Sequence, residues 1–192
     1  MTARQYILTV LLLLAASVGS WVFLNVLQER SIPIADKTRP DSYMENVSGA
    51  RFDEQGNLKD ELIAPHLLHF SEGDTTDVTS PHLIIYNADS TGQPWHVTSN
   101  YGKALDGVNS IELWDNVKLR QPESADNAEI IMTTTQITIY PKTQFAHTDQ
   151  PVKVIQLGSV VNSVGLDADI KTGTIKLLKE AHGKYQQEVQ AQ

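Results

Sequence analysis

Cysteine is absent from this chain of 192 residues, and basic residues are few. Without cysteine the protein has no disulfide, no thiolate zinc site, no iron–sulfur cluster and no cysteine nucleophile. The 15 Lys and Arg residues are outnumbered by 23 Asp and Glu residues, which gives a formal net charge of −8. Because phosphate binding requires a basic surface, this balance argues against a nucleic-acid partner.

Proline and glycine are also sparse, at 8 and 11 residues, and they are spread along the chain. Their distribution excludes a collagen-like repeat and a long low-complexity linker. The hydrophobic content of 41% is too high for a disordered chain, and the length suits one domain of ordinary size. Since no covalent cross-link is available, that domain must be held together by its hydrophobic core.

One long apolar run lies near the amino terminus. Residues 6–27 carry no charge, and as a helix they would span about 33 Å, enough to cross a bilayer core. Arg4 precedes the run, so the positive-inside rule predicts that residues 1–5 stay in the cytoplasm and the rest is exported. A signal peptide cleaved after Ser20 is the alternative, but the apolar run continues past that position. Both interpretations export the same domain.

The exported part begins with a short tether. Residues 28–40 contain Pro33 and Pro40 with charges between them and show no apolar period, as is typical of a linker. Residues 41–192 are predicted to form the folded domain. Helical signals there are weak, whereas strand signals are abundant: Ile130 to Tyr140 is rich in β-branched residues, and apolar residues alternate with polar ones in several other segments.

Glycine-containing turns separate these segments at short intervals. Glycine supplies the positive φ that tight hairpins require. The predicted turns are 54–57, 71–74, 90–93, 105–107 and 171–174. Many short strands joined by hairpins predict an all-β, antiparallel sandwich or roll.

A spacing of 35 residues recurs in the domain. It separates Pro81 from Asn116 and Asn116 from Pro151, and each of the three is predicted to open a strand, which favours a stack of similar hairpins. In the segment Leu83 to Tyr86 both faces of the predicted strand are apolar, so the pattern does not decide which face points into the core.

No motif for catalysis or metal binding is present. Six histidines lack a known ligand spacing, and His66 and His69 are predicted to point to opposite sides of one strand. Nucleophile elbows and phosphate-binding loops are missing. Carboxylates could act on sugars by residue type alone, namely Glu112, Asp115, Asp167 and Asp169. Trp95 and Trp114 could stack on sugar rings, but aromatic residues on strands usually pack across strands. The sequence therefore predicts no enzyme, no cofactor and no metal.

Several short motifs follow one another in a particular order after the apolar run. They are Asp41 to Met44 (DSYM), Arg51 to Asp53 (RFD), Leu62 to Pro65 (LIAP), Thr79 to Pro81 (TSP), Pro94 to Val97 (PWHV), Ile111 to Val117 (IELWDNV) and Ser163 to Leu166 (SVGL). Together with the length and the anchor, this order resembles the LptC family of lipopolysaccharide-export proteins. The resemblance spans nearly the whole chain.

The resemblance implies an architecture and a cellular role. It implies a periplasmic β-jellyroll, OstA-like and built of stacked antiparallel hairpins, on one transmembrane helix in the inner membrane. It also implies that the chain receives lipopolysaccharide from the ABC transporter LptBFG and passes it to LptA. Energy must come from the partner ATPase, since this chain has no nucleotide site.

A carrier of acyl chains through water needs a continuous apolar trough, because each methylene kept from water contributes about 0.8 kcal/mol. Alternating apolar residues are expected to line such a trough, although they could equally form an ordinary closed core. The predicted lipid-binding residues are Phe52, Ile111, Leu113, Val117, Leu119, Ile137, Ile139, Phe145, Val152, Val154, Ile175 and Leu177.

The resemblance also implies head-to-tail stacking through sheet edges, with the amino-terminal edge toward the transporter and the strands from about Val164 to Leu178 toward LptA. Gly158 and Gly165 are expected to flank the last hairpin. The predicted partner-binding residues are Gly158, Val164, Gly165 and Leu166. The leading alternative is a membrane-tethered β scaffold that assembles a periplasmic complex without binding lipid, followed by an enzyme acting on envelope glycans.

Overall fold

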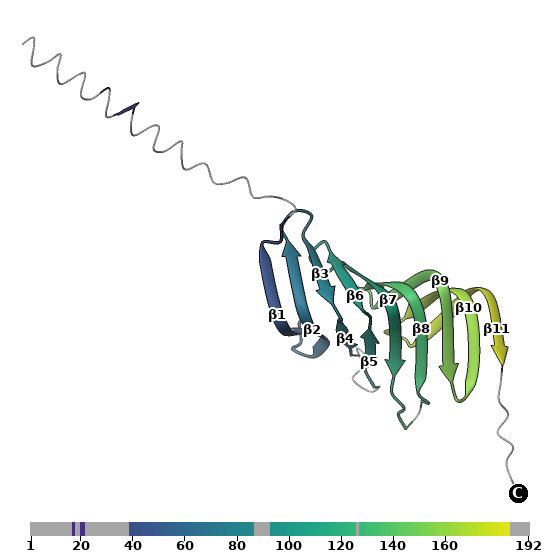
Figure 1. Ribbon diagram of the computed structural model, residues 1–192. Coiled ribbons are helices and arrows are strands. Elements are labelled where there is room, and N and C mark those ends of the chain that lie inside the picture. The colour runs from purple at the N-terminus through teal and green to yellow at the C-terminus, as the bar shows by residue number, and fades with distance from the viewer. Residues whose placement is uncertain (1–16, 18–19, 22–38, 87–92, 126, 185–192) are drawn as a thin grey trace, which may run out of the picture. The chain divides into compact units, whose positions relative to one another are not determined.

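The computed structural model describes residues 17, 20–21, 39–86, 93–125 and 127–184 (Figure 1). The chain divides into two compact units, Met1–Arg39 and Pro40–Gln192. Within the described ranges, no helix is long and apolar enough to cross a membrane. The anchor at 6–27, the alternative cleavage site and the tether at 28–40 fall mostly outside these ranges, so they stay predictions.

The second unit is one antiparallel sheet of eleven strands among its described residues. The strands are β1 (Ser42–Phe52), β2 (Leu58–Phe70), β3 (Thr75–Thr79), β4 (His82–Ile85), β5 (Trp95–Thr98), β6 (Tyr101–Leu105), β7 (Ser110–Gln121), β8 (Ile130–Tyr140), β9 (Phe145–Gln156), β10 (Ser159–Asp169) and β11 (Thr174–Lys184). This architecture confirms the predicted all-β, antiparallel class.

Four of the five predicted turns are confirmed, and glycine is used in each as expected. Gly56, Gly73, Gly107 and Gly173 have φ between 59° and 84°, a conformation that other residues adopt only with strain. The fifth predicted turn, 90–93, lies mostly outside the described residues.

The long strands bend midway, and the bends line up from strand to strand. Register shifts occur between Trp114 and Val117 in β7 and between Val164 and Leu166 in β10. Between β3 and β4 the bend interrupts the strand completely: β3 ends at Thr79, and β4 begins at His82 after Ser80 and Pro81. Such bulges combine an extra residue with a local change of direction.

The 35-residue spacing marks these bends and not strand starts, so that prediction was wrong for two of its three positions. Pro81 does precede β4, but Asn116 and Pro151 lie inside β7 and β9. Asn116 has a φ of 59°. In the sequence, a bend inside a strand looks like the end of a strand, because both interrupt the alternation of apolar and polar residues.

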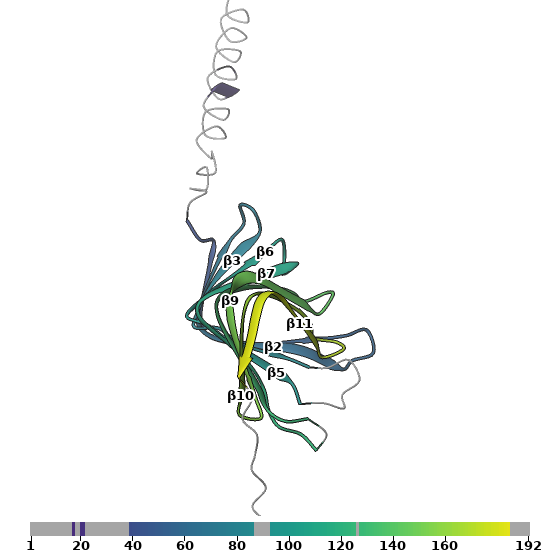
Figure 2. The same cartoon turned by 90° about the vertical axis from the view of Figure 1, so that its right-hand side faces the viewer.

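Bending folds the sheet into two facing limbs, seen in Figure 2. One limb contains β4 and β5 and the other contains β3 and β6, and the long strands run through both. Hydrogen bonds satisfy polar groups along the bend: Asn100 N donates to Asp115 O at 2.8 Å, and Thr148 Oγ1 donates to Gln136 O at 2.7 Å. The limbs therefore enclose a common interior.

The main core fills this interior along β4, β5 and β7 to β10. Its members come from both limbs, for example Val97 and Leu119 from one and Ile137 and Ile139 from the other. The structure also shows which face of the segment Leu83 to Tyr86 points inward. Leu83 and Ile85 are buried in the core, whereas Ile84 and Tyr86 are half-buried on the outer face.

Candidate functional site

An open cavity of about 440 Å³ lies between the limbs at the amino-terminal end of the sheet. It is lined mainly by apolar side chains from β1, β2, β3, β4, β6 and β7. The lining residues are Met44, Gly49, Ala50, Arg51, Asp60, Leu62, Leu67, His69, Thr76, Val78, Pro81, Leu83, Gly102, Ala104, Gly107, Val108, Ile111 and Leu113. Its size and apolar lining are those of a ligand site.

Small residues explain why the interior is open here. Gly49 on β1 and Ala104 on β6 face the cavity, and a Cβ added at Gly49 would meet no heavy atom within 4 Å. At the equivalent depth in β8, Ile137 and Ile139 fill the space between the limbs. Because protein interiors otherwise pack densely, a run of small side chains on facing strands leaves volume that a ligand can occupy.

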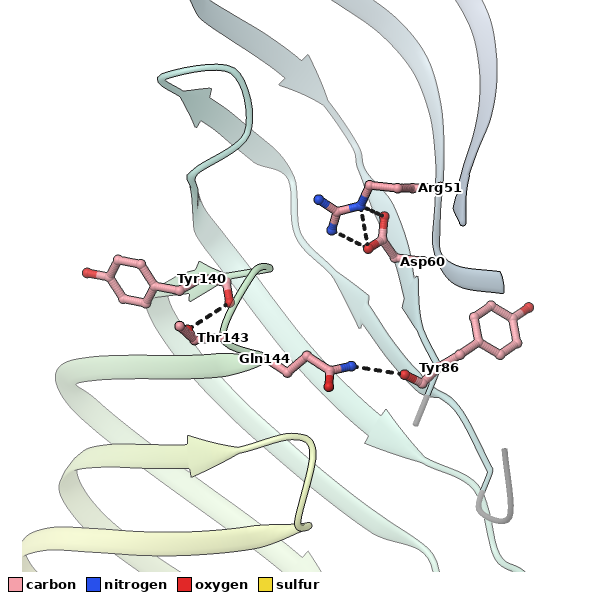
Figure 3. Close-up of polar contacts among 6 residues, drawn as sticks. All are labelled: Arg51, Asp60, Tyr86, Tyr140, Thr143 and Gln144. Atoms are coloured by element: carbon pink, nitrogen blue, oxygen red, sulfur yellow. Dashed lines mark hydrogen bonds and ion pairs between the residues drawn. The ribbon is translucent and has the colours of Figure 1, made fainter. Parts of the chain in front are cut away.

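An ion pair borders the cavity on the β4–β5 limb. Arg51 on β1 lies opposite Asp60 on β2, and its Nε donates to Oδ1 and Oδ2 of Asp60 at 3.2 and 3.0 Å (Figure 3). The Arg51 Nη2 contacts Asp60 Oδ2 as well. A carboxylate facing an apolar space is stable only when paired, so Arg51 allows Asp60 to be there.

A second polar contact lies at the cavity on the other limb. His69 on β2 and Thr76 on β3 form a hydrogen bond of 3.1 Å between Nδ1 and Oγ1. His66 lies on the outer face beside Tyr43, with ring centroids 6.3 Å apart. The two histidines therefore point to opposite sides of β2, as predicted. Among the described residues, no group of three His, Cys, Asp or Glu side chains could hold a metal ion.

Beyond this cavity the described residues of β7 to β10 pack the interior into the main core. Two further cavities of about 10 Å³ each lie deeper between the limbs. Such a volume holds no more than about one water molecule.

The predicted lipid-binding residues divide between these two regions. Ile111 lines the open cavity, and Leu113, a fully buried member of the main core, borders it. In the closed core lie Val117, Leu119, Ile137, Ile139, Val152 and Val154, with Ile175 and Leu177 packed against it. Phe52 is 59% exposed at the end of β1, and Phe145 is half-buried beside Tyr140. A lipid contact at any of them stays a prediction.

Sequence reasoning missed the cavity residues of β2 and β3. Leu62 and Ala64 face inward at even positions, but after Pro65 the inward residues are Leu67 and His69, at odd positions. The bend changes the phase of the alternation, because it adds a residue to one strand. A search for alternation that allowed one phase change at Pro65 would have found them.

The predicted partner-binding residues lie on and beside β10. Gly158 is in the β9–β10 turn, while Val164, Gly165 and Leu166 are in β10, which pairs with β9 and with β11. The expectation that Gly158 and Gly165 flank the last hairpin was wrong, because that hairpin is β10–β11. Gly165 has a φ of 82°, and an added Cβ would lie 3.0 Å from Leu178, so it serves the bend in β10. A partner contact at these four residues stays a prediction.

The two edges of the described sheet are β1 and β11. β1 pairs with β2, β11 pairs with β10, and each is unpaired on its other side within the described sheet. An unpaired edge presents backbone donors and acceptors that another strand can use.

The carboxylates considered for sugar chemistry are dispersed. Asp115 accepts a hydrogen bond from Asn100 at the bend, Asp167 contacts His147, and Asp169 accepts from the Thr172 N–H. Trp114 stacks on Tyr101 of the neighbouring strand with ring centroids 6.1 Å apart, and Trp95 is buried in the core. The cross-strand role expected of Trp114 is therefore confirmed.

Two histidines on the outer surface have shifted pKa values of opposite sign. A hydrogen bond of 2.7 Å to Asp167 raises the pKa of His147, and contacts with Asp149 add to the effect. Burial lowers the pKa of His96, and the charges of His82 and Arg120 act in the same direction.

The two histidines should therefore change stability with pH in opposite ways. A raised pKa stabilises the fold fully below the unfolded value of about 6.5, and the effect is lost as pH rises through the folded pKa. A lowered pKa destabilises the fold as pH falls below about 6.5.

We expect His147→Gln to cost more stability at pH 5.5 than at pH 8, by less than about 1 kcal/mol because the site is solvated. The stability of His96→Gln relative to the parent should be higher at pH 5.5 than at pH 8, because the substitution removes a group that resists protonation in the fold. Urea unfolding at both pH values measures the differences, and parallel pH profiles for all three proteins would contradict the assignment.

The fold and the cavity define an all-β, jellyroll-like protein whose folded sheet encloses an apolar interior open at one end. The model of a family described as "Lipopolysaccharide-assembly, LptC-related" matches residues 9–186. The chain therefore belongs to the LptC family, and this membership supports a role in lipopolysaccharide transport.

Comparison with curated protein sequences gave no match. Among solved structures, the chain is similar to LptH from Pseudomonas aeruginosa, the LptA homologous periplasmic component of the conserved lipopolysaccharide transport device. The TM-score is 0.43 and the identity 10%, and the alignment covers 79% of this chain and 99% of LptH.

Proposed function

We propose that the chain is an inner-membrane-anchored, periplasmic component of lipopolysaccharide export. In this role it receives lipopolysaccharide from the LptBFG transporter and passes it to LptA along its apolar interior. The observation that carries the proposal is the open cavity between the limbs, in a chain that belongs to the LptC family. The acyl chains would lie in the cavity while the glycan stays in water.

The energetics favour acyl chains as the occupant. The cavity wall is apolar apart from a few groups, and the ion pair and the His69–Thr76 contact satisfy its main polar side chains. Each methylene that enters would contribute about 0.8 kcal/mol. A polar glycan would instead lose its hydrogen bonds to water without finding replacements.

Site-specific photocrosslinking tests this proposal with a matched pair of neighbours. Leu62 lines the cavity, whereas Ile63, the next residue of β2, is 44% exposed on the outer face. A photoreactive residue at Leu62 is expected to give lipopolysaccharide adducts in cells, and one at Ile63 should give few, because successive residues of a strand face opposite sides. Equal yields, or none at Leu62, would contradict lipid binding and favour a scaffold that binds no lipid.

Transfer to LptA is proposed to use the free edge of β11. Removing residues 171–192 deletes that strand, whereas removing 185–192 leaves it whole. We expect the longer deletion to weaken capture of purified LptA by about tenfold, since strand addition depends on main-chain hydrogen bonds. The shorter deletion should capture LptA normally. Circular dichroism verifies that both proteins keep their sheet, and full capture without β11 would exclude edge pairing there.

A further inference from the structure

A polar contact joins the two limbs on the open side of the fold. Gln144 lies in the β8–β9 turn, and its Nε2 donates a hydrogen bond of 3.2 Å to the carbonyl of Tyr86, the residue after β4. Figure 3 shows the Gln144 side chain reaching from its turn to the Tyr86 backbone. We call this contact the clasp.

Each side of the clasp is fixed to its own limb. The Ile170 N–H donates to the carbonyl of Gln144 at 2.8 Å, which ties the β8–β9 turn to the end of β10. The Tyr86 N–H donates to the carbonyl of Lys59 at 3.0 Å, which ties the other side to β2. A separation of the limbs at this point therefore has to break the Gln144–Tyr86 hydrogen bond.

The clasp lies where the open part of the interior ends. Asp60, Leu83 and Ile111 line both the open cavity and the small cavity beside Gln144. Ile170 lines this small cavity and also a second small cavity deeper between the limbs. We call the region around the second cavity the far compartment. Its walls include Trp95, Leu119, Met132, Ala168, Ile170 and Ile175. An apolar path thus continues past the clasp, but it is closed there.

The side chain of Gln144 is buried, so its hydrogen bonding matters for the stability of the contact. Its φ of 53° is a left-handed turn conformation that Asp74 and Leu157 also adopt in other hairpin turns of the fold. A buried amide also needs a hydrogen-bond partner, and Tyr86 supplies it.

We propose that Gln144 gates the movement of acyl chains from the open cavity into the far compartment. The inference rests on the proposed function, because it concerns the same ligand in the same interior. While Gln144 is bonded to Tyr86, an acyl chain stops at Asp60, Leu83 and Ile111. When the bond breaks, the limbs separate and Ile139, Ile170 and Ile175 become the surface on which the chain advances.

The test compares two photocrosslinking positions in the full chain with purified lipopolysaccharide. Leu62 reports occupancy of the open cavity, and the half-buried Ile175 reports the far compartment. Gln144→Glu removes the donor and places an acceptor against the Tyr86 carbonyl. We expect it to raise the ratio of Ile175 adducts to Leu62 adducts about threefold to tenfold, the effect of one hydrogen bond.

A matched control lies in the same turn. Thr143 donates from Oγ1 to the carbonyl of Tyr140 at 3.3 Å, a contact within the turn that does not reach the other limb (Figure 3). Thr143→Ala is expected to leave the adduct ratio unchanged. A rise equal to that of Gln144→Glu would assign the effect to loosening of the turn and would overturn the role of Gln144.

The opposite change locks the clasp. Because the chain has no cysteine, Gln144→Cys and Tyr86→Cys can be joined selectively by a bismaleimide whose spacer reaches the outer face, where the Tyr86 side chain lies. The locked protein is expected to keep its Leu62 adducts and to lose those at Ile175, which no unfolded variant would do. Ile175 adducts that persist in the locked protein would overturn the gate while leaving the proposed function intact. Absence of adducts at both positions in every form would overturn the proposed function and the gate with it.

Discussion

Replacing Gly49 by tryptophan is expected to reduce lipopolysaccharide binding by roughly a hundredfold. Gly49 lies opposite Leu62 in the β1–β2 pair and faces the open cavity, and an added Cβ would meet no heavy atom within 4 Å. The Cβ would therefore enter open space, and the indole would extend from it into the cavity. If it excludes four methylenes, the loss is about 3 kcal/mol, which corresponds to roughly a hundredfold in affinity.

The neighbouring residue provides the control for this substitution. Ser48 lies opposite Ile63 and is exposed on the outer face, so Ser48→Trp adds the same side chain outside the cavity. Its lipopolysaccharide binding should match that of the parent protein. Titration of both purified variants with fluorescently labelled lipopolysaccharide gives the comparison. Unchanged binding by Gly49→Trp would show that the acyl chains lie elsewhere.

Ile139→Ala is expected to destabilise the folded unit by about 2–5 kcal/mol. Ile139 is completely buried between the limbs and packs in the main core. Truncating it removes favourable apolar burial and leaves a cavity that the rigid sheet cannot close. Since domains of this kind are stable by only about 5–15 kcal/mol, the change consumes a large share of the total.

Urea unfolding followed by tryptophan fluorescence, to which the buried Trp95 contributes, measures this loss. Ile131→Ala is the matched control, because Ile131 is on the same strand but half-buried on the outer face. It should cost clearly less than Ile139→Ala. Equal losses at the two positions would mean that the interior around Ile139 is loosely packed, and would favour an open trough along the whole sheet.

Local sequence patterns predicted the strands and turns well. The alternation in Val117 and Leu119, and in Val152 and Val154, is that of inward-facing strand residues, and all four are buried. Glycines at the hairpins were predictable because a positive φ is a property of a single residue. Both kinds of signal depend on neighbours in the chain.

Patterns that combine distant residues could not be predicted in the same way. Asn116 and Pro151 interrupt their strands in sequence, and only the paired neighbours show that the interruption is a bend within one strand. Gly165 has the same ambiguity, since a bend glycine and a turn glycine both have a positive φ. Pairing across strands, not residue type, distinguishes the two cases.

The sequence by itself determined that this protein is an acidic, cysteine-free β domain whose strands have one apolar face, because alternation, composition and turn residues act locally. The order of its short motifs was also enough to show the resemblance to the LptC family. Only the tertiary structure decided where the interior is open. That depends on how the small side chains of β1 and β6 face the opposite limb, and on the contact that Gln144 makes with Tyr86, which lies 58 residues away in the chain. Packing volume is a sum over residues far apart in sequence, so periodicity identifies the inward side chains but cannot separate a filled core from a cavity.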